Sequence, residues 1–93
     1  MPVGLLQVRL RLPGAQSLKD KRSVVSGLLA RARHEYSVSA AELDSLDEPK
    51  ASVVGFAYLS NDGRHATVVL NKLLDELGRS PAYYVEGHEF ALL

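Results

Sequence analysis

Hydrophobic and polar residues alternate at the start of the chain. From Leu6 to Leu12 every second residue is a leucine or a valine, and the residues between them are polar. This period of two is typical of a strand with one buried and one solvated face. A Pro-Gly pair at residues 13–14 follows and ends the segment. The pattern predicts a first strand with Leu6, Val8 and Leu10 facing the core.

The period then changes to that of a helix. Ser17 followed by Asp20 resembles a capping box, with aspartate in place of the usual glutamate or glutamine. Apolar residues recur after it at helical spacing, at Leu18, Val25, Leu28, Leu29, Ala32 and Tyr36. The pattern predicts a helix of about five turns.

The second half of the chain repeats this logic. A short strand is predicted at residues 38–43, followed by an acidic loop at 44–50 and a strand at 51–60 that is apolar on both faces. A second helix follows residues 61–62, and Gly78 is expected to end it in a left-handed conformation. The Ser-Pro pair at 80–81 leads into a last strand at 83–93.

The order strand, helix, strand, strand, helix, strand predicts one ferredoxin-like α+β domain over residues 1–93. In this split βαβ fold (βαββαβ), two helices cover one face of a four-stranded antiparallel sheet and the other face stays open. We expect the first and third strands to lie side by side in the centre and to run parallel. On that expectation, the two turns that lead into the helices lie next to each other at one edge.

Composition limits the classes of function. A chain of 93 residues without cysteine has no disulfide framework, no thiolate zinc site and no thiol nucleophile. No segment has the roughly 18 consecutive apolar residues of a membrane span, and no signal-peptide pattern is seen, so we expect a cytoplasmic protein without membrane partners. The formal net charge is zero, yet residues 1–34 hold seven basic residues and one acidic residue. A basic first half is therefore set against an acidic remainder.

The segments "SLKDKR" and "SNDGRH" each open a predicted helix. Helix N-termini offer unpaired N–H groups and partial positive charge, which favour anions. If the two openings are adjacent, they form a composite phosphate or RNA site, and its candidate residues are Ser17, Lys19, Lys21, Arg22, Asn61, Arg64 and His65. The alternative is that the serine, asparagine and aspartate side chains only cap the helices.

The same motifs carry a family resemblance. "LPGAQSLKDKRSVV" after an alternating strand, and "SND" after a long apolar strand, resemble the YlxP-like family of small bacterial proteins, also called domain of unknown function 503. The resemblance spans essentially the whole chain and implies a ferredoxin-like fold and a cytoplasmic bacterial protein. It also implies a gene neighbourhood of transcription elongation, translation initiation and ribosome maturation. It brings no established reaction.

The stretch "GFAYL" in the third strand partly matches the aromatic strand of RNA-recognition domains. On this hypothesis Phe56 and Tyr58 lie on the open face of the sheet and stack bases, with Arg9 and Arg11 beside them. The alternative is that the rings pack in the core or in a dimer contact, and that the arginines pair with Glu89 across the strands.

Three hypotheses for function follow. The first is a non-catalytic accessory protein of RNA or ribosome metabolism that binds RNA or a ribosomal subunit without DNA specificity. The second is a homodimer or a protein-interaction module that uses the open face. The third is an acylphosphatase-like hydrolase with Arg22 in the phosphate site and Asn61 positioning water, although the glycine-rich cradle is missing. No catalytic residue, metal site or cofactor is predicted, and the acidic loop is interpreted as solvated.

Overall fold

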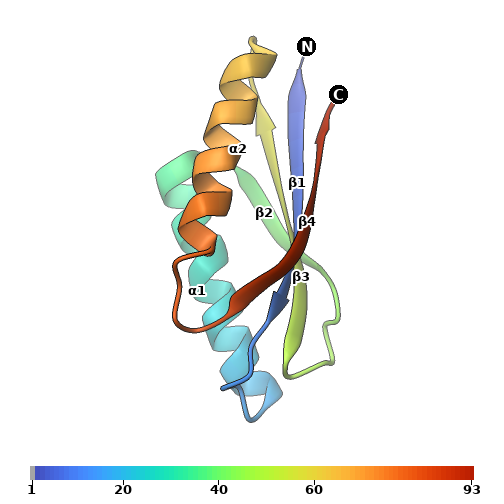
Figure 1. Cartoon of the computed structure of the whole chain (residues 1–93), viewed down its shortest axis with the longest axis vertical. Coiled ribbons are helices and arrows are strands. Elements are labelled where there is room, and N and C mark those ends of the chain that lie inside the picture. The colour runs from blue at the N-terminus through green and yellow to red at the C-terminus, as the bar shows by residue number, and fades with distance from the viewer. Residues whose placement is uncertain (1) are drawn as a thin grey trace.

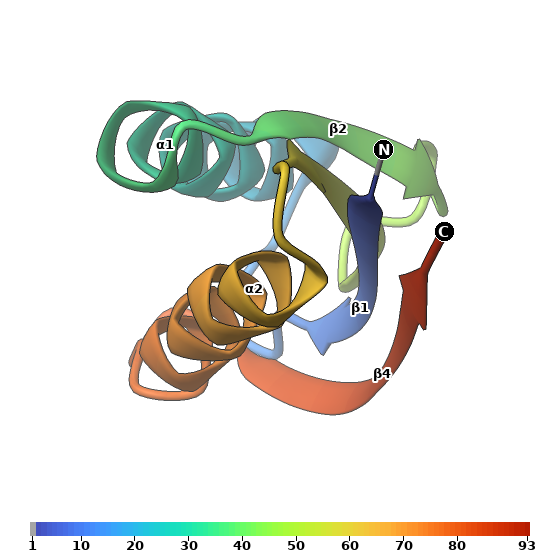
Figure 2. The same ribbon diagram turned by 90° about the horizontal axis from the view of Figure 1, so that it is seen from above.

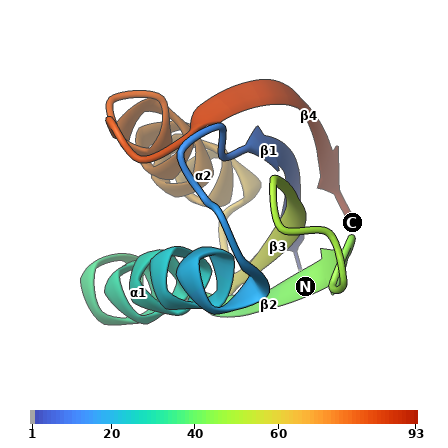
Figure 3. The same cartoon turned by 90° about the horizontal axis from the view of Figure 1, so that it is seen from below.

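The computed structural model describes residues 2–93 and contains the six elements in the predicted order (Figure 1). Strands β1 (Val3–Arg11), β2 (Ser39–Asp44), β3 (Ala51–Leu59) and β4 (Tyr84–Leu92) form one sheet in the order β2-β3-β1-β4. Helices α1 (Leu18–Tyr36) and α2 (Gly63–Leu77) both lie on one side of it, as seen along the long axis (Figures 2 and 3). The fold is ferredoxin-like α+β, as predicted.

The direction of the two central strands differs from the expectation. β1 and β3 pair along their full lengths but run antiparallel. The physical reason is the split βαβ connection: the crossover through α1 returns β2 parallel to β1, and the tight β2–β3 connection then reverses the chain. The prediction that β1 and β3 run parallel was wrong. The antiparallel arrangement places the start of α1 and the start of α2 at opposite ends of the molecule.

The core lies between the sheet and the helices. Leu6, Val8 and Leu10 of β1 are at most 3% exposed, so the alternation identified the buried face of this strand correctly. They pack in one cluster with the apolar stripes of the helices, including Leu28 of α1 and Leu70 of α2. Burial of such side chains is the main term that stabilises the two-layer arrangement.

The ends of the helices follow local chemistry. The Ser17 Oγ accepts a hydrogen bond from the Asp20 N–H at 3.1 Å, and the Asp20 carboxylate accepts one from the Gln16 N–H at 3.0 Å. The Ser17 cap is therefore confirmed, and the start of the helix is capping-box-like, with Asp20 reaching the N–H of Gln16 instead of that of Ser17. At the other helix, Gly78 has φ −67° and is not left-handed, so that prediction was wrong. At the end of α1 the C-cap residue is left-handed instead, since Ser37 has φ 55°.

Strand β4 forms one edge of the sheet and is strongly curved along its length (Figures 2 and 3). Its register with β1 shifts between Arg9 and Leu10, and such a bulge increases local bending. At the other end of the strand, Val3 and Leu93 exchange two backbone hydrogen bonds of 3.1 and 2.9 Å. The first and last strands therefore finish side by side.

Tyr36 near the end of α1 ties the two helices together, because its hydroxyl donates a hydrogen bond to the Glu76 carboxylate of α2. This hydrogen bond, together with burial and the charge of Glu76, raises the pKa of Tyr36 to about 12. The folded state therefore holds the phenolic proton more tightly than the unfolded chain, whose tyrosine pKa is about 10. The stabilisation is complete below pH ~10 and is lost as pH rises from ~10 toward ~12.

Absorbance titration at alkaline pH is expected to show this tyrosine ionising late. The Glu76→Gln variant should shift the Tyr36 transition back toward the ordinary tyrosine range, and Tyr36→Phe should remove it. Because burial also raises the pKa of Tyr83, the Tyr83→Phe variant is the control that separates the two late transitions. A Tyr36 transition unchanged by Glu76→Gln would contradict the assigned hydrogen bond.

Candidate functional site

The composite anion site expected from the two helix starts does not form. Lys19, Lys21 and Arg22 lie in the first two turns of α1, whereas Arg64 and His65 lie in the first turn of α2. These turns are at opposite ends of a molecule whose longest extent is 42 Å (Figure 1). The prediction that they lie next to each other was wrong, because β1 and β3 run antiparallel.

Lys21 is a structural residue rather than an exposed phosphate ligand. Its side chain is fully buried, and its Nζ donates hydrogen bonds to the backbone oxygens of Ser45 at 2.6 Å and Leu46 at 3.2 Å. The ammonium also pairs with the Glu42 carboxylate at 3.0 Å, which accepts a hydrogen bond from Ser52 Oγ at 2.6 Å. A buried charge needs such partners. Lys21 therefore fixes the β2–β3 loop to α1.

The remaining basic residues of α1 are exposed. Lys19 and Arg22 are three residues apart and share one stripe at the start of the helix, whereas Arg33 lies in its last turn. Arg33 donates a hydrogen bond to the Ala40 backbone oxygen at 2.7 Å. Within residues 2–93, neither Lys19 nor Arg22 forms an ion pair. These two side chains leave a small basic surface at the start of α1.

The polar groups at the start of α2 are occupied by local contacts. The Asp62 carboxylate accepts a hydrogen bond from the Arg64 N–H at 2.9 Å and so occupies the cap position, while Asn61 is exposed just before it. His65 Nε2 lies 3.1 Å from the Tyr58 hydroxyl, and the two rings meet edge to face with centroids 5.7 Å apart. The segment caps its helix, as the alternative interpretation of the sequence expected.

The aromatic side chains of β3 do not lie on the open face. Phe56 pairs in register with Leu6 and is 2% exposed in the core, and Tyr58 is partly buried against the same core. Paired residues of neighbouring strands point to the same face of a sheet, so the helix-covered side of Leu6 fixes that of Phe56. The placement of Phe56 and Tyr58 on an open-face stacking platform was wrong.

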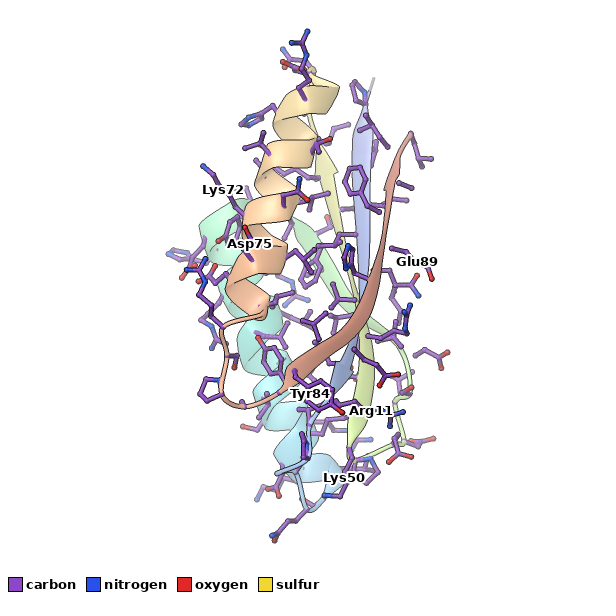
Figure 4. All side chains as sticks on the ribbon, in the orientation of Figure 1. Arg11, Lys50, Lys72, Asp75, Tyr84 and Glu89 are labelled. Atoms are coloured by element: carbon purple, nitrogen blue, oxygen red, sulfur yellow. The ribbon has the colours of Figure 1, made fainter. Side chains whose placement is uncertain are left out.

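Arg9 and Arg11 do lie on the open face, and both are paired there. Arg9 contacts Glu89 of β4 at 3.3 Å, which confirms the cross-strand ion pair expected from the sequence. Arg11 pairs with Glu86, whose hydrogen bond and charge raise the pKa of the guanidinium. Figure 4 shows Glu89 pointing away from the helices and Arg11 beside Tyr84. These pairs neutralise the basic side chains that a nucleic acid would need.

The open face instead carries an apolar groove of about 460 Å³. All four strands line it. The strand register places four small residues on the open face, where they line the bottom of the groove: Ala41 of β2, Gly55 and Ala57 of β3, and Ala91 of β4. Leu5 and Leu43, which also line it, are 38% and 52% exposed. Its polar lining is limited to Gln7, Ser39 and Glu89.

A glycine makes part of this groove possible. A Cβ at Gly55 would lie 2.5 Å from Leu43 Cδ1, so a larger residue at this position would displace the leucine side chain from β3. The groove was not predicted from the sequence, although small residues at alternate positions of the second and third strands were its signal. That signal becomes readable only when the register assigns Gly55 and Ala57 to the open face.

The two residues expected for an acylphosphatase-like site are not brought together by the fold. Arg22 and Asn61, which an acylphosphatase-like mechanism would bring together, lie near the starts of different helices at opposite ends of the fold. In residues 2–93 no group of three or more histidine or acidic side chains is arranged to hold a metal ion. No helix in this part of the chain is long and apolar enough to cross a membrane.

The fold and its surface define a class of protein: a ferredoxin-like domain with a covered face that forms the core and an open face that carries an apolar groove. The profile of the family described as "Protein of unknown function (DUF503)" matches residues 3–89, which is nearly the whole chain. The chain belongs to this family, as its sequence motifs indicated. No curated protein matches it.

Proposed function

We propose that this domain is a non-catalytic interaction module that binds another protein chain through the open face of its sheet, in the bacterial cytoplasm. The observation that carries the proposal is the apolar groove of about 460 Å³ between exposed Leu5 and Leu43. Contiguous exposed apolar surface costs free energy in water, and covering it with a partner recovers that cost. Binding is favoured over catalysis because Glu89, the one acidic side chain of the groove, is paired with Arg9.

The exposed basic stripe of α1 supports a second candidate, contact with nucleic acid in RNA or ribosome metabolism. Lys19 and Arg22 are exposed and lack ion-pair partners among residues 2–93, so their charges are free to contact phosphate. This candidate is the first hypothesis from the sequence, with its phosphate contacts reduced to Lys19 and Arg22. Lys21 is excluded by its burial, and Arg64 because it lies in the first turn of α2, at the opposite end of the molecule from the start of α1.

Affinity isolation from bacterial lysate, with and without nuclease, tests both candidates. The open-face variant is Ala57→Glu, and its matched control is Ala30→Glu at an exposed position of α1. The basic-stripe variant is Lys19→Glu with Arg22→Glu, and its control reverses the charges of Lys72 on α2 and Arg79 in the turn after it. Figure 4 shows Lys72 on the outer side of that helix.

A protein chain that is retained after nuclease treatment, lost from Ala57→Glu and kept by Ala30→Glu is the expected result. Loss of bound RNA from the Lys19/Arg22 variant alone, with strong dependence on salt, would favour the second candidate instead. If Ala57→Glu retains every partner of the wild type, the open face is not the binding surface and the proposed function is rejected.

A further inference from the structure

We infer that the occupant of the groove is a second copy of this chain, in an isologous dimer that buries the two open sheet faces against each other. The inference rests on the proposed function of the open face and names its partner. In such a dimer the two sheets form the inner layers and the helices of both copies form the outer layers. Three properties of the open face favour a second copy.

The first property is charge. The arginines of the open face are matched within each copy, Arg9 by Glu89 and Arg11 by Glu86. An RNA or a strongly charged peptide therefore meets no unpaired complementary charge on this face. A second copy brings the same matched set, and the formal net charge of the chain is zero, so two copies approach without overall repulsion.

The second property is shape. In an isologous interface the same patch must supply both the projecting and the recessed parts. One row across the sheet does so, because the register places Leu5 of β1 between Ala57 of β3 and Ala91 of β4. Leu5 is 38% exposed, and its two neighbours in the row are alanines that leave space beside it. A leucine of one copy can therefore fill the space beside the leucine of the other.

The third property is size. With strands ~4.8 Å apart and ~3.3 Å per residue, three strands of nine residues and one of six cover ~520 Å² before side-chain relief is counted. Stable interfaces typically bury about 800 Å² per partner. Face-to-face contact of two copies is thus near the size that a specific dimer needs, and it covers the apolar groove fully.

Sedimentation velocity of the full chain across micromolar concentrations tests the inference. The wild type is expected to sediment as a dimer of twice the 10.1 kDa chain mass. Ala57→Glu places a carboxylate in the groove floor, and Ala91→Glu does so at an exposed position of β4 that tolerates a larger side chain. Each should raise the dimer dissociation constant at least about tenfold, because an unpaired buried charge is costly. Ala30→Glu, on the outer surface of α1, should leave the dimer intact, and circular dichroism checks that every variant is folded.

A wild type that stays monomeric at the highest concentration overturns the inference. If in that case Ala57→Glu still loses a specific protein partner in the affinity experiment, the open face binds a different chain and the proposed function stands. A dimer that persists in folded Ala57→Glu and Ala91→Glu uses another surface and also overturns the inference. If the wild type is monomeric and Ala57→Glu affects no partner, both the dimer inference and the proposed function are rejected.

Discussion

Replacing Lys21 with methionine is expected to lower the free energy of unfolding by about 3 kcal/mol. The substitution keeps a similar volume but leaves the Glu42 carboxylate without its buried cation and removes the donor to the Leu46 backbone oxygen, while the Ser45 oxygen keeps its hydrogen bond from the Glu48 N–H. Breaking a buried pair by removing one partner typically costs ~3–5 kcal/mol, since an uncompensated charge remains. Urea unfolding followed by circular dichroism measures the effect.

The matched control is Lys19→Met, two residues earlier, where the side chain is exposed and unpaired among residues 2–93. It should change stability by no more than about 0.5 kcal/mol. Adding Glu42→Gln to Lys21→Met should restore part of the lost stability, because the stranded charge is removed. Equal unfolding midpoints for Lys21→Met and Lys19→Met would contradict the structural role of Lys21 and return it to the candidate phosphate ligands.

Replacing Phe56 with alanine is expected to lower the free energy of unfolding by about 3–4 kcal/mol. The ring is 2% exposed in the core, and its removal forfeits both its burial and the contacts that surround it. The other phenylalanine of the chain provides a matched control, because Phe90 on β4 is 40% exposed. Phe90→Ala should cost less than about 1.5 kcal/mol.

The comparison also separates the two interpretations of the aromatic strand. A ring on an open stacking platform would contribute little to stability and much to RNA binding. Similar unfolding free energies for Phe56→Ala and the wild type would therefore argue against the core position. The same denaturation measurements test both phenylalanine variants under identical conditions.

The sequence allowed the element order, the ferredoxin-like fold and the buried face of β1 to be predicted. Those features depend on local periodicity and on capping residues such as Ser17, which act within a few residues of the chain. The side of the sheet on which Phe56 lies could not be predicted in the same way, because both alternating sets of residues in β3 are apolar. Its orientation is set by the register with Leu6, more than forty residues away in the chain.

The burial of Lys21 had a signal in the sequence. Lys21 lies three residues after Leu18 and four before Val25, on the apolar stripe of α1, and a charge on such a stripe needs a buried partner. Only the folded chain identifies that partner, since Glu42 lies on the next element. The prediction of a composite anion site was wrong for a different reason. It depended on the relative direction of β1 and β3, which decides whether the two helices begin at the same end of the molecule or at opposite ends.

The two hydrogen bonds between Val3 and Leu93 have a practical consequence for labelling. Residues 2 and 93 both lie at the end of the sheet near Leu5 and Ala91, so a fluorescent protein attached at either of them would crowd the groove (Figure 1). The β2–β3 loop at residues 45–50 lies at the opposite end. Joining residue 2 to residue 93 and opening the chain at residues 47–49, beyond the backbone oxygens that Lys21 holds, gives a circular permutant in which every strand keeps its neighbours and the attached reporter leaves the groove free.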